Sequence, residues 1–124
     1  MGFADITARS ESGGRDYYPG GAPVVSPKGA KFAMQVMPGT ARDPGFGVAP
    51  AQSETPSEYN RVGRDYLGAL HQKYGGDPAK MWGAYNWGPG NLDAALGRYG
   101  NDWLKYAPKE TQDYVRRNLA GSGL

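Results

Sequence analysis

The sequence predicts a predominantly α-helical fold of the α+β class. Apolar residues recur at helical spacing between Tyr59 and Leu70, and glycine or proline pairs bound the periodic stretches. No two segments form a convincing pair of strands. A chain of 124 residues can bury a core without disulfide or metal support, so we expect one domain over residues 1–124.

The first predicted helix covers Phe3–Ser12 and ends at the pair Gly13-Gly14, because glycine readily adopts the left-handed conformation of a helix C-terminus. Glu11 then lies in the last helical turn. There the helix dipole disfavours a negative charge, which raises the pKa of a carboxyl group. A raised pKa suits a group that donates a proton at neutral pH.

The next forty residues mix loops with short helices. We expect a loop rich in Gly, Pro and Tyr over residues 15–28. The apolar stretch Ala30–Met37 predicts a second helix, and Pro38 opens a further helical turn through Arg42, since proline is tolerated where no amide donor is needed. Residues 43–54 contain two glycines and two prolines and are expected to be a connecting loop.

Stronger helix signals follow in the second half. Thr55-Pro56 with Glu58 is typical of a capped helix start, and this helix is expected to reach about Tyr74 before Gly75-Gly76. Asp77-Pro78 repeats the start signal for a helix that ends near Tyr85. Later elements are expected over Asn91–Tyr99, around Trp103, and over Lys109–Leu119.

The composition excludes several kinds of active site. The chain has no cysteine and one histidine, His71, which excludes a Cys/His zinc site, a cysteine nucleophile and a disulfide framework. A Ser-His-Asp triad would need His71, which lies in a periodic helix, and no nucleophile elbow is present. Phosphate-binding and dinucleotide-binding motifs are also missing. We therefore expect no metal or other cofactor, and any catalysis would depend on carboxyl groups.

Charge and terminal sequence bear on partners and location. The net charge of +2 comes without a basic arm, so no nucleic-acid partner is expected. The start of the chain, Met1 to Arg9, is too short and too polar for a signal peptide or a membrane span. Action outside the cytoplasm would then need another carrier, such as a larger parent protein, a virion or a pore. No heptad pattern suggests association, so we expect a monomer.

Four segments carry the chemistry. In order they are Glu11-Ser12-Gly13-Gly14, then Ser26–Ala30 leading into Met34–Pro38, then Ala84–Gly90, and finally Glu110–Val115. Over residues 6 to about 119 this arrangement resembles the soluble lytic transglycosylase family, which is related to goose-type lysozymes and includes phage-type and endolysin domains. The resemblance implies a lysozyme-like fold, peptidoglycan glycan strands as the partner, and action on the cell wall in the periplasm or outside the cell.

The resemblance also implies residue roles. Glu11 would be the single catalytic acid and base that cleaves the β-1,4 bond between N-acetylmuramic acid and N-acetylglucosamine. The substrate's N-acetyl group would assist, and the muramoyl 6-hydroxyl would attack to form a 1,6-anhydro product. Substrate binding would fall to Ser26, Met34, Gln35, Tyr85, Asn86 and Tyr114. Each of these also has a purely structural interpretation, as a turn residue, a surface amide, a helix brace or a core side chain.

Two residues depart from the family pattern. Phe32 stands where the family usually has glycine, and Trp87 where it usually has a small residue. Each aromatic ring either fills a gap in the core or offers a stacking face that changes the sugar cleft.

Two other functions remain open. The first is lysozyme-type hydrolysis, which would need a second carboxylate to hold a water, with Asp16 or Asp43 as candidates. The second is a peptidoglycan-binding module without catalytic activity.

Overall fold

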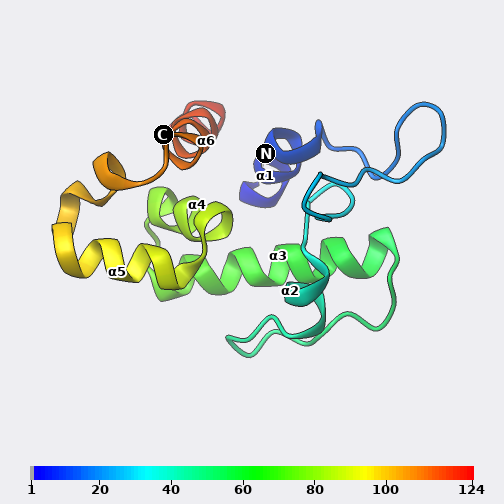
Figure 1. Cartoon of the computed structure of the whole chain (residues 1–124), viewed down its shortest axis with the longest axis horizontal. Helices are drawn as coiled ribbons and strands as arrows, with labels where there is room; N and C mark the ends of the chain where they lie inside the picture. Colours follow the sequence, from blue (N-terminus) through cyan, green and yellow to red (C-terminus); the bar gives the residue numbers. More distant parts are fainter. Residues whose placement is uncertain (1) are drawn as a thin grey trace. The chain divides into compact units, whose positions relative to one another are not determined.

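The computed structural model describes residues 2–124, which form α-helices joined by long loops and one 3₁₀ helix (Figure 1). The chain divides into two compact units, residues 1–69 and residues 70–124. Within residues 2–124, none of the helices has the length and apolar character needed to cross a membrane. In order, the elements are α1 (Phe3–Ser12), α2 (Pro38–Arg42), α3 (Pro56–Lys73), α4 (Pro78–Trp87), α5 (Pro89–Tyr99), η1 (Gly100–Tyr106) and α6 (Lys109–Ser122).

The capping signals set the helix ends as predicted. Gly13 adopts φ 71° and donates its N–H to Arg9 O at 2.9 Å, which stops α1. Asp77 accepts hydrogen bonds from the first amides of α4, and Pro78 occupies its first turn. At the start of α3, the Thr55 hydroxyl accepts from Glu58 N–H at 3.4 Å. The predicted helical character of the chain is thus confirmed.

The predicted helix over Ala30–Met37 is wrong. Residues 30–37 form a segment of turns, with turn conformation at residues 32–35 and isolated antiparallel bridges from Lys31 to Val25 and to Val36. Phe32 and Gln35 adopt φ 66° and 52°, in the left-handed region that a right-handed helix does not contain. Phe32, Ala33, Met34 and Val36 are buried by neighbouring segments whereas Met37 is exposed, so tertiary packing overrides the local pattern.

The core of the first unit is built around this segment of turns. Phe32 is 5% exposed, and its ring meets those of Tyr17 and Tyr59 edge-on, at centroid distances of 6.3 and 5.6 Å. Met34 is 2% exposed and packs on α3 at Gly63. A Cβ atom at Gly63 would lie 2.8 Å from the Met34 Cβ, so glycine allows this segment to approach the helix closely.

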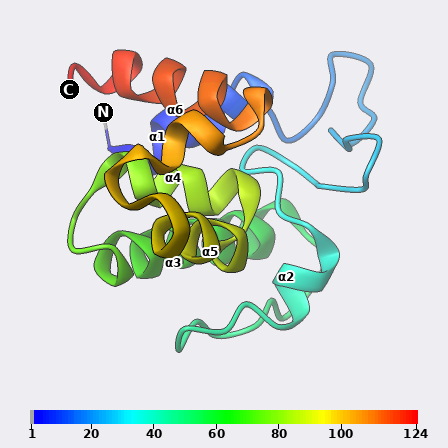
Figure 2. The same cartoon turned by 60° about the vertical axis from the view of Figure 1, so that its left-hand side comes forward.

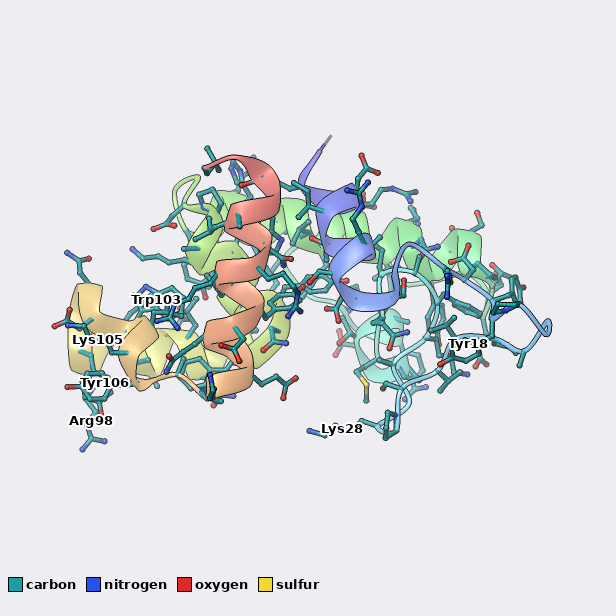
Figure 3. All side chains as sticks on the ribbon, turned by 90° about the horizontal axis from the view of Figure 1, so that it is seen from above. Tyr18, Lys28, Arg98, Trp103, Lys105 and Tyr106 are labelled. Atoms are coloured by element: carbon teal, nitrogen blue, oxygen red, sulfur yellow. The ribbon has the colours of Figure 1, made fainter. Side chains whose placement is uncertain are left out.

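In the second unit, α4 lies alongside α5 and α6, and η1 packs against α5 (Figure 2). The indole ring of Trp103 on η1 packs against Gly83 of α4, where an added Cβ would come within 2.7 Å of it. The exposed rings of Tyr99 and Tyr106 stack at 3.7 Å, and Tyr106 lies beside Arg98 at the edge of this unit (Figure 3). Close backbone approach at Gly83 therefore fixes η1 on the helices.

Hydrogen bonds from Arg61 hold the loop over residues 43–55 against α3. Its guanidinium donates to Ala49 O at 3.0 Å and to Pro50 O at 2.9 Å, while also pairing with Glu58. The Glu58 carboxylate in turn accepts Gln52 N–H at 2.9 Å. Because a guanidinium has five donors in a fixed plane, it can hold two loop carbonyls and a carboxylate at once.

Two glycines on α3 provide a paired test of the packing at Met34. We expect Gly63→Ala to lower the free energy of unfolding by about 1 kcal/mol or more, because the new methyl group would overpack against Met34. Gly68→Ala, with no atom within 4 Å of its Cβ position, should raise it by about 0.5–1 kcal/mol through helix propensity alone. Urea unfolding of both variants measures this. Equal shifts in the two variants would contradict the close approach.

The contact between Glu58 and the loop also predicts a pH dependence. The hydrogen bond from Arg61, and then that from Gln52 N–H, hold the pKa of Glu58 below its ordinary value of 4.5. A carboxyl group with a lowered pKa stabilises the fold above its unfolded pKa, and this contribution is lost as pH falls through the lowered value. Carboxyl ¹³C titration should place the midpoint below 4.5 and move it upward in Arg61→Gln. A midpoint unchanged by that substitution would contradict the contact.

Candidate functional site

Glu11 lies in the last turn of α1. Ser12, the next residue, links the end of this helix to the segment of turns. The Ser12 hydroxyl lies 2.8 Å from Ala33 O and 3.0 Å from Ala8 O, and it accepts from Arg15 N–H at 3.0 Å. One hydroxyl thus serves the helix, the loop after it and residue 33. Glu11 is partly exposed, one residue before this junction.

Asp16 and Asn60 form the second tie. Asp16 Oδ1 accepts from Ala33 N–H at 3.0 Å and from the Asn60 side-chain amide at 2.8 Å. Asn60 Oδ1 accepts from Met34 N–H at 3.2 Å. These bonds join the loop after α1, the segment of turns and α3. The structure therefore brings the end of the Glu11 helix together with the segment that carries Met34 and Gln35.

The predicted binding residues of the first unit have structural tasks. The Gln35 amide donates to Phe32 O at 2.8 Å and stabilises the turn in which Phe32 and Gln35 are both left-handed. Ser26 Oγ accepts from Ala30 N–H at 3.0 Å and closes the turn from which exposed Lys28 projects (Figure 3). Met34 belongs to the core of the unit. Roles in sugar binding for these three residues stay predictions.

The second unit holds the other predicted binding residues. Asn86 Oδ1 accepts from the Thr111 hydroxyl at 2.8 Å, which joins α4 to α6. Tyr114 is buried on α6, with the Arg117 guanidinium 5.8 Å from its ring centroid. Tyr85 and Trp87 are both partly exposed on the last turn of α4. The contact between Asn86 and Thr111 supports the interpretation of Asn86 as a brace.

Sequence reasoning did not identify Ser12 and Asn60 as organisers of the site. Ser12 had a signal, because it directly follows Glu11 in the first motif. Asn60 had none, since a single amide on a helix surface does not reveal a partner 26 residues away in sequence. Asp16 and Asp43 are the candidates for a second catalytic carboxylate. In the structure Asp16 Oδ1 binds Ala33 N–H and the Asn60 amide, whereas Asp43 is exposed at the end of α2.

Within residues 2–124, His, Asp and Glu side chains form no group of three or more that could hold a metal ion.

Comparison with known proteins relates this arrangement to a family. Residues 6–106 match the family described as the transglycosylase SLT domain. The soluble lytic murein transglycosylase of Escherichia coli K12 is 34% identical over 110 residues, which cover 78% of this chain and 17% of that protein. The corresponding Salmonella typhimurium protein is 33% identical, with the same coverage. The chain thus spans less than a fifth of the length of these relatives.

Solved structures give the same result. The 70 kDa soluble lytic transglycosylase of Escherichia coli superposes with a TM-score of 0.76 at 30% identity, over 95% of this chain and 20% of that one. An inactive Glu-to-Gln mutant of the lytic transglycosylase Slt from Pseudomonas aeruginosa gives 0.74 at 28% identity, over 94% of this chain and 20% of that one. The predicted lysozyme-like, predominantly helical fold is confirmed.

Two substitutions of Asp16 test whether it organises the site or takes part in chemistry. Asp16→Ala leaves Ala33 N–H and the Asn60 amide without their acceptor, and we expect it to lower the free energy of unfolding by about 1–3 kcal/mol. Asp16→Asn retains an acceptor oxygen and should cost less. If Asp16 only organises, Asp16→Asn also keeps most of the activity on peptidoglycan. Loss of activity with unchanged stability in Asp16→Asn would instead indicate a catalytic carboxylate.

Proposed function

Because the chain belongs to the transglycosylase SLT family, we propose that it is a peptidoglycan lytic transglycosylase. Its substrate is then the β-1,4 bond between N-acetylmuramic acid and N-acetylglucosamine. The observation that carries this proposal is the position of Glu11, in the last turn of α1 and one residue before the Ser12–Ala33 hydrogen bond. A carboxyl group held at a helix C-terminus is favoured in its protonated form, as a general acid requires.

The proposed reaction uses this one carboxyl group twice. Glu11 donates its proton to the glycosidic oxygen as the bond from the anomeric carbon breaks. The substrate's N-acetyl oxygen stabilises the positive charge at that carbon. The Glu11 carboxylate then accepts the proton of the muramoyl 6-hydroxyl while the hydroxyl oxygen bonds to the anomeric carbon. A 1,6-anhydro sugar results, and no water is consumed.

Two further observations support a single-carboxylate mechanism. Asp16, the nearest candidate for a second carboxylate in sequence, has an oxygen already committed to Ala33 and Asn60. The Pseudomonas aeruginosa neighbour is described as an inactive Glu-to-Gln mutant, which supports a catalytic role for a glutamate here. Hydrolysis by an activated water would give the same bond cleavage with a different product, and no described contact favours it.

We propose that six residues bind substrate, namely Ser26, Met34, Gln35, Tyr85, Asn86 and Tyr114. The family match over residues 6–106 runs through both units, which supports treating residues 1–124 as one working domain. Glycan strands of the cell wall are then the partner. The protein would act as a monomer on the cell wall, in the periplasm or outside the cell. Association with a virion would be one way to reach that site.

Glu11→Gln tests the proposal directly. General acid–base catalysis contributes about 10²–10⁴-fold in rate, so we expect clearing of purified peptidoglycan to slow by at least about 100-fold. Asp102→Asn makes the same carboxyl-to-amide change at an exposed position on η1 and should leave the rate unchanged. Unchanged activity in Glu11→Gln would overturn the assignment of the acid.

Product mass separates the remaining possibilities. A lytic transglycosylase releases muropeptides that are one water lighter than the products of a hydrolase. Products that retain this water would show lysozyme-type hydrolysis by the same domain. Binding to sedimented cell wall, with neither product formed, would instead identify a module without catalytic activity.

A further inference from the structure

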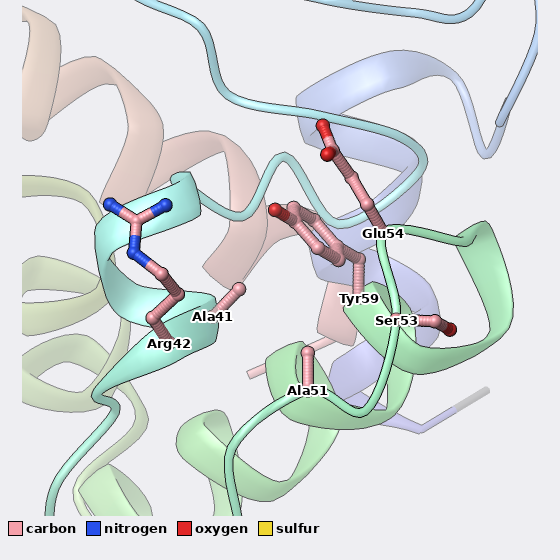
Figure 4. A pocket seen from close by; sticks show the side chains of 6 residues that line it. All are labelled: Ala41, Arg42, Ala51, Ser53, Glu54 and Tyr59. Carbon is pink, nitrogen blue, oxygen red and sulfur yellow. The ribbon is translucent and has the colours of Figure 1, made fainter.

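A small cavity lies in the first unit, between α2, the loop after it and the start of α3 (Figure 4). Its volume is about 160 Å³. None of its lining residues is among those assigned above to cleavage of the glycan. The lining consists of Ala41, Arg42, Ala51, Ser53, Glu54 and Tyr59.

The walls of this cavity are fixed before any ligand binds. Ala51 N–H donates to Ala41 O at 2.8 Å, which joins the loop to α2. Arg61 holds the two carbonyls just before Ala51, and Ser53 shares a hydrogen bond with Thr55 at 2.9 Å. A preformed cavity loses little conformational entropy when a ligand enters.

Two polar groups at the cavity lack partners. The Tyr59 side chain is 4% exposed, yet its hydroxyl makes no hydrogen bond within the described residues and points toward the side on which Arg42 lies (Figure 4). The Arg42 guanidinium likewise forms no ion pair or hydrogen bond in the part of the chain that the structure describes. The hydroxyl oxygen of Tyr59 is not among the fully buried atoms without a partner, so both groups are accessible at the cavity and can bind a ligand there.

The charged side chains at the cavity determine which charge a ligand should carry. Glu54, the one acidic residue of the lining, forms an ion pair with Lys31. The positive charge of Arg42 is therefore the uncompensated charge at the cavity. A guanidinium and a phenolic hydroxyl together match the two oxygens of a carboxylate. The methyl groups of Ala41 and Ala51 supply a small apolar wall beside them.

We propose that this cavity binds a small carboxylate that carries an α-methyl group. Arg42 pairs with the carboxylate, the Tyr59 hydroxyl donates to one of its oxygens, and the alanine methyls contact the ligand methyl. Two parts of bacterial cell wall have this chemistry, the D-alanine terminus of a peptide stem and the lactyl group of muramic acid. The identification of these two sources rests on the proposed function, whereas the proposal that the cavity binds a small carboxylate does not depend on it.

The test is a titration of the ¹⁵N-labelled whole chain, followed by amide chemical shifts. With N-acetyl-D-alanine, we expect saturable shifts at residues 41–42, 51–54 and 59. The matched neutral probe, N-acetyl-D-alaninamide, should give none. Inorganic phosphate tests for simple anion attraction, and binding as strong as that of the carboxylate would overturn the proposal. So would the absence of saturable shifts with every carboxylate.

Variants separate the groups involved. Arg42→Gln and Tyr59→Phe should each weaken binding, by about tenfold or more for the arginine, because a charge-assisted hydrogen bond is lost. Tyr59→Phe keeps the ring that packs on Phe32. Arg64→Gln, at an exposed arginine of α3, is the matched control and should bind like the parent chain. If Arg42→Gln also binds like the parent chain, the proposal is wrong.

Two comparisons identify the source and separate this proposal from catalysis. D-alanyl-D-alanine binding more tightly than N-acetylmuramic acid would indicate a peptide terminus, and the reverse order would indicate the lactyl group. Glu11→Gln should bind every probe as the parent chain does, because the cavity contains none of the proposed catalytic residues. Loss of cleavage with intact binding would therefore leave this proposal standing by itself.

Discussion

The carboxylate of Asp16 is the contact on which the first unit most depends. One oxygen accepts from the backbone of Ala33 and from the side chain of Asn60, so a single group joins three segments that are distant in sequence. Hydrogen bonds to a charged acceptor contribute about 1.5–3 kcal/mol each, more than neutral ones. Ser12 adds a bond from the helix end to Ala33 O. These bonds join the segment of turns to α1, to the loop after it and to α3.

Burial of the Phe32 ring explains how this segment tolerates an unusual backbone conformation. Phe32 has a left-handed conformation, which glycine, the residue that the resemblance to the family led us to expect here, adopts without strain. An L side chain pays about 1 kcal/mol or more for such a conformation. The burial of the ring against Tyr17 and Tyr59 offsets that cost, since a fully buried aromatic ring contributes about 1.5–3 kcal/mol. The departure from the family pattern is thus accommodated inside the core.

The sequence predicted those parts of the molecule that depend on neighbours in the chain. Gly13, Asp77 and Pro78 determine helix ends through local backbone chemistry, and these ends were predicted correctly. The Ala30–Met37 segment was mispredicted because Phe32 and Met34 pack on α3 and on the loop after α1, and periodicity does not reveal such partners. In the same way, the motif led to the prediction that Glu11 is catalytic, which stays a prediction, whereas the role of Asn60 is evident only from its contacts.

The bonds that position the segment of turns have a consequence for sequence divergence. Ser12, Asp16 and Asn60 bind the main-chain N–H and C=O groups of Ala33 and the N–H of Met34. Every amino acid except proline supplies these groups. These hydrogen bonds therefore persist whatever side chains stand at positions 33 and 34, and the backbone keeps its place beside α1. What restricts the side chain at position 34 is burial against Gly63 of α3, so the polar and the apolar contacts of this segment constrain the sequence separately.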